Sequence, residues 1–133
     1  MNNSGQITGD LLDPFVGIPA SHAFLYSDGQ MQDLGVLRPG EATFAEAINN
    51  FGEVVGRNFS QDPSRGSIAF VYSNGKLIDL NSLLSHRDAS RVKLLEAVAI
   101  NNNGQILVSS GGHSYVLTCH MPGQSKQCTR FIP

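Results

Sequence analysis

The sequence has little charge and no basic cluster, and these absences exclude several classes of protein. Charged residues make up 15% of its 133 residues, and the formal net charge is −2. Nucleic acids and anionic membrane surfaces are bound by clustered Lys and Arg side chains, so we expect neither as a partner. No apolar run reaches the roughly 18 residues of a membrane-spanning helix, so we expect no membrane insertion. The first residues, Met1 to Gly5, lack the basic start and the apolar core of a signal peptide.

Motifs that carry catalysis or hold cofactors are also missing. No glycine-rich phosphate loop leads from a strand into a helix, and no Gly-x-Ser-x-Gly nucleophile elbow occurs. The acidic loop that a calcium site needs is absent as well. We therefore expect a protein that is not an enzyme and that has no cofactor and no metal site.

Turn-forming residues, by contrast, are abundant. The chain has 14 glycines and six prolines, together with many Asn, Ser and Asp residues. These residues favour tight turns, so the chain is expected to form many short elements. With 133 residues and 41% hydrophobic content it is long enough for one domain with a real core.

The chain is built on an internal repeat of about 46 residues. One block contains Ile-Asn-Asn, a glycine and a short apolar stretch, and a second contains Ala-Phe followed by an Asp-Gly or Asn-Gly pair and Asp-Leu. The first block occupies residues 47–56 and 99–108 and, in part, 1–9; the second occupies 22–34 and 68–80 and, shortened, 113–118. The same order at similar spacing indicates repeated structural units.

Each unit reads as four short antiparallel strands. In the second unit the expected strands are Phe44–Ile48, Glu53–Gly56, Ile68–Tyr72 and Leu77–Leu80. Tight hairpins are expected at Asn49–Gly52 and at Asn74–Gly75, because Asn and Gly tolerate positive φ. The third strand is apolar at every position, so both of its faces should be covered.

We therefore predict an all-β fold of three four-stranded units that resemble β-propeller blades, at about residues 1–43, 44–93 and 94–133. A β-trefoil, which closes with three such units in one chain, is the alternative. The first unit lacks its first strand, and residues 119–133 replace the last turn and fourth strand of the third. A turn or two of helix is expected within 81–93, capped by Asn81 or Ser82.

At this point the residues resemble a known family. Ile48-Asn49-Asn50 with its following Gly-Glu-Val-Val-Gly, the tripeptide His22-Ala23-Phe24 and Asp33-Leu34-Gly35 are similar to the HAF repeat, a probable extracellular bacterial repeat named for that tripeptide. The resemblance covers essentially the whole chain. It implies a repeat fold and an extracellular or periplasmic location. It implies no activity, because the family has no established catalytic residues.

Repeated polar residues are interpreted as structural. His22 and His113 occupy the position that Ile68 fills in the second unit, which indicates a packing position rather than a ligand. Asp33 and Asp79 are also equivalent and are expected to accept hydrogen bonds from backbone N–H groups at the turn after the fourth strand.

The asparagine pairs and the two cysteines are interpreted in the same way. Asn49 and Asn50 are expected to shape their turn and to link neighbouring units through their side chains. Cys119 and Cys128 enclose a short polar loop; a disulfide is expected in an exported protein and free thiols in a cytosolic one. A metal site that also uses His120 is the weaker alternative, because the ligand spacing is unusual.

Variable loops on a constant frame favour a binding or scaffolding module with an unknown protein or glycan ligand. The loops 11–21 and 57–67 are the expected binding segments, with Phe15, Phe59 and Arg65 as possible anchors. The alternative function is a propeller-type hydrolase or lyase acting on glycans. That function requires several carboxylates that meet at one opening of the ring.

Assembly is the last expectation. Three units cannot close a propeller, and an incomplete unit at each end exposes apolar strands with unpaired edges. Two chains related by a two-fold axis would supply six units, each end completing the other's partial unit, so a homodimer is expected. A β-trefoil would instead be a monomer.

Overall fold

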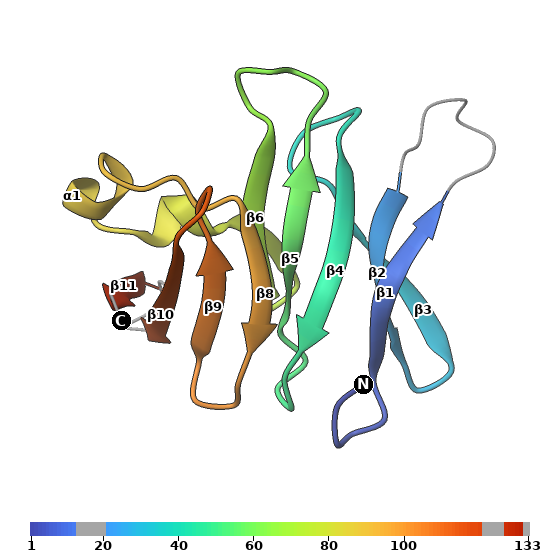
Figure 1. The fold of residues 1–133 in the computed structure, drawn as a ribbon. Coiled ribbons are helices and arrows are strands. Elements are labelled where there is room, and N and C mark those ends of the chain that lie inside the picture. Colours follow the sequence, from blue (N-terminus) through green and yellow to red (C-terminus); the bar gives the residue numbers. More distant parts are fainter. Residues whose placement is uncertain (13–20, 121–126, 132–133) are drawn as a thin grey trace.

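The structure is a computed structural model that describes residues 1–12, 21–120 and 127–131, and over these residues the chain is all-β (Figure 1). Its strands form three separate antiparallel sheets. The first sheet contains β1 (Ile7–Leu12), β2 (Ser21–Ser27) and β3 (Gln30–Gly35). The second contains β4 (Ala42–Ile48), β5 (Val54–Phe59), β6 (Ser67–Ser73) and β7 (Lys76–Asp79). The third contains β8 (Glu96–Ile100), β9 (Gln105–Ser109), β10 (Ser114–His120) and β11 (Gln127–Phe131).

Within each sheet every strand pairs with its neighbours in the chain. Between sheets, β4 lies beside β1 and β2, and β8 lies in the corresponding way beside β5 and β6 (Figure 1). The second sheet is thus placed against the first in the same way as the third is placed against the second. No strand pairing joins one sheet to another among the described residues, so the sheets do not close into the barrel of a β-trefoil. That alternative is wrong.

The third sheet has a fourth strand, which the sequence interpretation did not expect. β11 pairs with β10 in antiparallel register, and Cys119 lies directly opposite Cys128. The prediction required an Asp-Gly or Asn-Gly turn at this point, as in the other two units. Here β10 and β11 are instead linked by a disulfide between Cys119 and Cys128. The expectation of a third unit that stops after three strands is therefore wrong.

The tight turns follow from residues that accept a left-handed backbone. Asp28 and Gly29 have φ values of 52° and 78°, and Asn74 and Gly75 have values of 53° and 77°. Two consecutive residues with positive φ form the turn that matches the twist of an antiparallel hairpin. These pairs join β2 to β3 and β6 to β7.

The core lies between the sheets rather than within one of them. The first sheet packs on the second through Ala23, Leu25, Leu34, Val54, Phe70 and Tyr72. The second packs on the third through a larger cluster that includes Val55, Ala69, Val71, Leu80, Ala97, Ile106, Val108 and Leu117. β6 contributes to both clusters, so the expectation that this strand is covered on both faces is confirmed.

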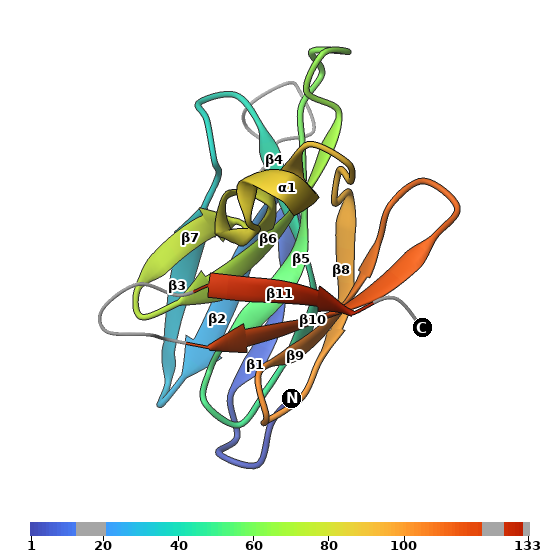
Figure 2. The same cartoon turned by 90° about the vertical axis from the view of Figure 1, so that its left-hand side faces the viewer.

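The expected helical segment is present as two short pieces. The 3-10 helix η1 (Leu80–Leu83) is capped by Asp79, which accepts a hydrogen bond from the Asn81 N–H. The helix α1 (His86–Ala89) is capped by Ser85. Asn81 and Ser82 are therefore not the caps. The strand β7 ends at Asp79, one residue before the expected end at Leu80, so the helical segment begins earlier. α1 and β11 lie on the same side of the molecule (Figure 2).

Candidate functional site

One asparagine closes the first turn of each unit. The Oδ1 atom of Asn49 accepts hydrogen bonds from the N–H groups of Phe51 and Glu53, both at 3.0 Å, and its Nδ2 donates to the Glu53 carboxylate at 2.9 Å. Asn side chains favour such turns because they bond the backbone a few residues further on. Asn2 and Asn101 make the corresponding bonds in their own units.

The same residues also join one sheet to the next. Asn2 Nδ2 donates to the carbonyl oxygen of Asn49 at 2.9 Å, and Asn49 Nδ2 donates to the carbonyl oxygen of Asn101 at 3.2 Å. The Asn3 N–H donates to Asn50 Oδ1 at 2.8 Å, and the Asn50 N–H donates to Asn102 Oδ1 at the same distance. We call this series the asparagine ladder; its members are Asn2, Asn3, Asn49, Asn50, Asn101 and Asn102. The prediction that these side chains link neighbouring units is confirmed.

The opposite end of the sheets carries the longer loops, between β3 and β4 and between β5 and β6 (Figure 1). We call the end of the molecule formed by residues 36–41 and 59–66 the loop edge. A buried carboxylate holds it together. Glu41 accepts from Arg65 Nε at 2.7 Å, from a second Arg65 guanidinium nitrogen at 3.1 Å and from Asn58 Nδ2 at 3.0 Å. Asn58 in turn accepts from the Leu37 N–H at 3.0 Å, so both loops are tied to β5.

The hydrogen bonds from Arg65 are the main cause that lowers the pKa of Glu41 from its ordinary 4.5 to about 2. Burial of the carboxyl opposes ionisation, but Asn58 and Ser60 add further hydrogen bonds that favour the charged form. Because the Glu41 side chain is only 6% exposed, the ion pair is a structural element of the loop edge rather than a loose surface contact.

The predicted anchors have different outcomes. Arg65 pairs with Glu41, and its carbonyl oxygen accepts from Lys93 Nζ at 3.0 Å. Its role as an anchor for a partner stays a prediction. Phe59 closes β5 at the loop edge and is 40% exposed, so its ring can contact a partner. Phe15 lies outside the described residues.

His22 is not a packing residue. Its Nδ1 lies 2.9 Å from the Asp33 carboxylate on the neighbouring strand, and the His22 side chain is 37% exposed. The imidazole reaches this polar partner, whereas the equivalent Ile68 is buried. His113 is exposed, so the expectation of packing is wrong for it as well.

The repeated aspartates behave as expected. Asp33 accepts from the Gly35 N–H at 2.7 Å and Asp79 from the Asn81 N–H at 2.8 Å. Partial burial of Asp33 opposes its ionisation, but the hydrogen bonds from His22 and Gly35 outweigh this effect and lower its pKa. Both carboxylates are therefore used at the turns after β3 and β7.

Glu46 of the second sheet is influenced by carboxylates on both neighbouring sheets, which sequence reasoning missed. Burial, followed by the neighbouring charge of Glu96 and then that of Asp10, raises the pKa of Glu46, while Arg57 opposes the effect. Arg57 Nε lies 3.8 Å from Glu96. Glu46 stands in a β-bulge of β4, and β8 has a bulge at the equivalent position. No spacing in the sequence indicates this influence, because it depends on how the sheets stack. Among the described residues, no group of His, Cys, Asp and Glu has an arrangement that could hold a metal ion.

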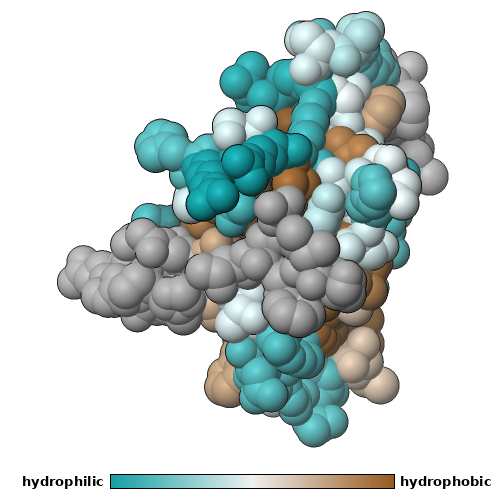
Figure 3. All heavy atoms as spheres, turned by 60° about the vertical axis from the view of Figure 1, so that its left-hand side comes forward, coloured by the Kyte–Doolittle hydropathy of each residue, from teal (hydrophilic) through white to brown (hydrophobic). Residues whose placement is uncertain are grey.

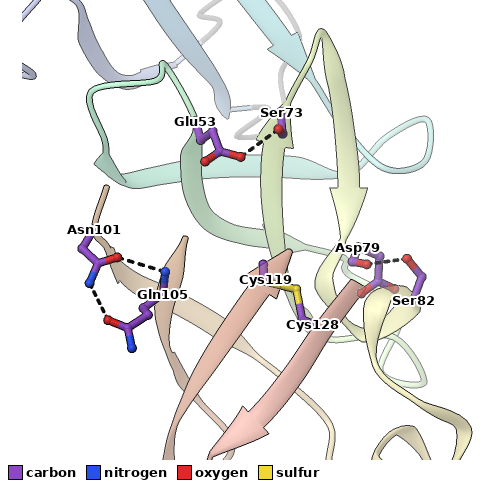
Figure 4. Close-up of a disulfide and its surroundings, with 8 residues drawn as sticks. All are labelled: Glu53, Ser73, Asp79, Ser82, Asn101, Gln105, Cys119 and Cys128. Carbon is purple, nitrogen blue, oxygen red and sulfur yellow. Dashed lines mark hydrogen bonds between the residues drawn. A yellow bond between two sulfur atoms is a disulfide. The ribbon is translucent and has the colours of Figure 1, made fainter. Parts of the chain in front are cut away.

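Cys119 and Cys128, the pair expected to be bridged in an exported protein, form a disulfide (Figure 4). Both residues are buried in the core between the second and third sheets. The interpretation of the two cysteines as metal ligands is wrong, because each sulfur is bonded to the other. The Cys119 N–H also donates to the carbonyl oxygen of Gly104, so the bridged strands are tied to the turn after β8.

Exposed apolar side chains are a further feature that the sequence interpretation did not identify. Phe51 lies in the turn between β4 and β5, where the other units have Ser4 and Asn103, and is 74% exposed. Others lie on the two outermost sheet faces and are treated below. The face of the molecule on the side of the third sheet shows hydrophobic patches between polar areas (Figure 3).

No protein-family model, curated protein or solved structure matches the sequence. The resemblance to the HAF repeat therefore rests on the residues quoted for it. Within the described ranges, no helix has the length and apolar character needed to cross a membrane.

Proposed function

We propose that this chain is a non-enzymatic binding or scaffolding module built from propeller-type units, and that its loop edge recognises a protein or a glycan. The observation that carries this proposal is the contrast between the two ends of the sheets. At one end the asparagine ladder repeats the same hydrogen bonds from sheet to sheet. At the other end the connection from β5 to β6 (residues 60–66) and its equivalent from β9 to β10 (residues 110–113) differ in length and sequence, and the first is tied to Glu41 through Arg65.

The propeller-type architecture is supported by the order of strands and by the packing. The second and third sheets are four-stranded meanders, and the first is a meander of three strands. Equivalent residues such as Ala23 and Ala69 are buried at successive interfaces between sheets. This is the arrangement that blades adopt around a propeller axis. It also agrees with the proposal that the chain is a HAF-type repeat.

The proposed location is extracellular or periplasmic. Disulfides persist in oxidising compartments and are rare in the cytosol. The bridge between Cys119 and Cys128 supports this location independently of any resemblance.

Phe59 is the residue at which a partner is expected to bind. Phe59 ends β5 at the loop edge, and its ring, 40% exposed, offers apolar contact area with only two side-chain torsions to fix on binding. Rings of this kind also stack on the apolar faces of sugars.

The test is a screen of the folded chain against a glycan library, read by thermal shift, and repeated with Phe59→Ala. The matched control is Phe51→Ala, which removes an exposed ring at the opposite end of the sheets. The proposal expects at least one glycan that stabilises the parent and Phe51→Ala but not Phe59→Ala. Equal stabilisation of both variants would place binding elsewhere and contradict the assignment to the loop edge.

A glycan hydrolase or lyase is the second candidate function, and the raised pKa of Glu46, with the charges of Glu96 and Asp10 among its causes, is the observation that favours it. Glycosidases pair one carboxyl of raised pKa with a second carboxylate. Incubation with the same library, followed by an assay for new reducing ends, tests this candidate. The binding proposal expects no cleavage, whereas the enzyme requires cleavage that is lost in Glu46→Gln.

A further inference from the structure

Each sheet has two faces with different partners. We call the face toward the preceding sheet the backward face and the face toward the following sheet the forward face. In the second sheet, Val54, Phe70 and Tyr72 form the backward face and pack on the first sheet. Val55 and Val71 belong to the forward face and pack on the third sheet.

The backward face of the first sheet carries the equivalent apolar residues but has no sheet in front of it. Ile7 corresponds to Val54, and Tyr26 corresponds to Tyr72. Ile7 is 41% and Tyr26 38% exposed, whereas Val54 is fully buried and Tyr72 is 7% exposed. Met31, which lies opposite Tyr26 on β3, is 52% exposed. Side chains that are buried in one sheet are thus open to solvent at the equivalent positions of another.

The forward face of the third sheet is open in the same way. Leu107 corresponds to Val55 and is 39% exposed, whereas Val55 is fully buried. Val116 lies opposite Leu107 on β10 and is half-buried, whereas the equivalent Val71 is fully buried. The two open faces are therefore the two halves of an interface that the chain builds twice within itself.

The asparagine ladder has matching ends. Every inter-sheet bond in it runs from donor to acceptor in chain order, from Asn2 to Asn49 and from Asn49 to Asn101. Within the described part of the chain, Asn101 Nδ2 has its partner in Gln105 but no acceptor on a further sheet. At the other end, the Asn2 carbonyl oxygen accepts from Gly5, as that of Asn49 does from Gly52, but no preceding asparagine reaches it. One end of the ladder thus offers a donor, and the other offers an acceptor.

We propose that a second copy of this chain docks head to tail, with the forward face of its third sheet on the backward face of the first sheet of its neighbour. Leu107 and Val116 of one copy then cover Ile7, Tyr26 and Met31 of the other. Asn101 Nδ2 donates to the neighbour's Asn2 carbonyl oxygen, and the Asn102 N–H donates to the neighbour's Asn3 Oδ1. The choice of a second copy as occupant rests on this chain's own two interfaces, which show which surface fits each open face.

The docking differs from the exchange of missing strands. Because β11 completes the third sheet, that sheet does not need a strand from another chain. The contact is instead made between sheet faces, as it is within the chain. It involves residues away from the loop edge, so it does not depend on the proposed binding at Phe59.

The experiment measures the mass of the full chain by light scattering after size exclusion, across a dilution series in the micromolar range. Four variants are compared with the parent, each first checked for parental circular dichroism. Leu107→Asp alters only the forward face and Met31→Asp only the backward face, and both positions are exposed, so the monomer should still fold. Asn3→Ala removes the predicted ladder acceptor. Phe51→Asp is the control, because Phe51 is an exposed apolar residue on neither face.

The expected result is a parent and a Phe51→Asp variant that associate as concentration rises, and two face variants that remain monomeric. An equimolar mixture of Leu107→Asp and Met31→Asp should form a pair of chains, because one intact forward face then meets one intact backward face. Asn3→Ala should associate about fivefold more weakly, since one hydrogen bond contributes roughly 1 kcal/mol. A parent that stays monomeric, face variants that associate like the parent, or a mixture that stays monomeric would each overturn the proposal.

Discussion

The side-chain amide of Asn49 donates a hydrogen bond to the carbonyl oxygen of Asn101, 3.2 Å away in the corresponding turn of the next sheet. The same side chain closes its own turn through Oδ1. A single residue therefore shapes one unit and fixes the position of the next. This double role makes the asparagine ladder the first place to test how the sheets are held together.

Asn49→Ala should lower the free energy of unfolding by about 2–4 kcal/mol, because it removes the acceptor of two part-buried N–H groups of the turn and the donor to Asn101. Asn49 is only 4% exposed, so water cannot readily replace the lost bonds. Asn3→Ala is the control, since the Asn3 side chain makes no hydrogen bond to the described residues. Urea unfolding at a concentration where the chain is monomeric provides the measurement. Equal stabilities of the two variants would remove the structural role given to Asn49.

Replacement of the turn glycines should reveal two different costs. Gly52 and Gly104 have φ values of 75° and 78°, so Ala at either position should cost about 1 kcal/mol of backbone strain. A Cβ at Gly104 would also lie 2.8 Å from the carbonyl oxygen of Cys119, whereas at Gly52 it would meet the end of the flexible Gln6 side chain. Gly104→Ala should therefore be the less stable variant in thermal unfolding, by roughly 1 kcal/mol or more. The reverse order would contradict the contact between this turn and β10.

The disulfide should stabilise the third sheet. Its cysteines are nine residues apart, and closure of such a loop contributes about 2–3 kcal/mol by restricting the unfolded chain. Intact mass before and after reduction should show the loss of one bridge, and reductant should lower the unfolding temperature of the parent. The double variant Cys119→Ser/Cys128→Ser should unfold at the temperature of the reduced parent and should not respond to reductant. Two free thiols in protein prepared under oxidising conditions would contradict the bridge.

The ion pair between Glu41 and Arg65 should make stability depend on pH. The folded-state pKa of Glu41 is about 2, below its ordinary value of 4.5, so the folded state favours the charged carboxylate. The resulting stabilisation, on the order of 3 kcal/mol, is fully present above about pH 4.5 and is lost as the pH falls toward 2.

The measurement is urea unfolding of the parent and of Glu41→Gln between pH 7 and pH 2. The difference in stability between them should be constant above pH 5 and should shrink as the pH falls through the acid range. Phe51→Ala, which changes no titrating group, should follow the parent at every pH. A parent and a Glu41→Gln variant with parallel pH profiles would show that Glu41 is not held in its charged form.

Much of the fold could be predicted because local chemistry decides it. Asn74-Gly75 can hardly be anything but a tight turn, and the continuous apolar stretch of β6 requires cover on both faces. The repeat then extended these assignments from one unit to the others. Where a unit departs from the repeat, this extension failed. β11 is joined to β10 by a disulfide instead of an Asp-Gly or Asn-Gly turn. His22 contacts Asp33, whereas the equivalent Ile68 of the second unit lies in the core.

The contacts of the candidate site were less predictable, because they depend on how elements pack. Glu41 and Arg65 are 24 residues apart and lie in different loops, so no periodicity relates them. Glu46 is influenced by the charge of Glu96 only because β4 and β8 lie next to each other. The exposed faces at Ile7 and Leu107 could be recognised only when their buried equivalents in the second sheet were visible.

The one-way order of donors and acceptors in the ladder also bears on how such a chain can change in length. A tandem duplication of residues 42–95 would place a copy of the second sheet between the second and third sheets. Its backward face would meet the forward face of an identical sheet, and its Asn49 copy would pass the ladder on in the same direction. A duplicated unit would therefore meet its neighbours through the same kinds of face and the same order of donor and acceptor that already join the three sheets.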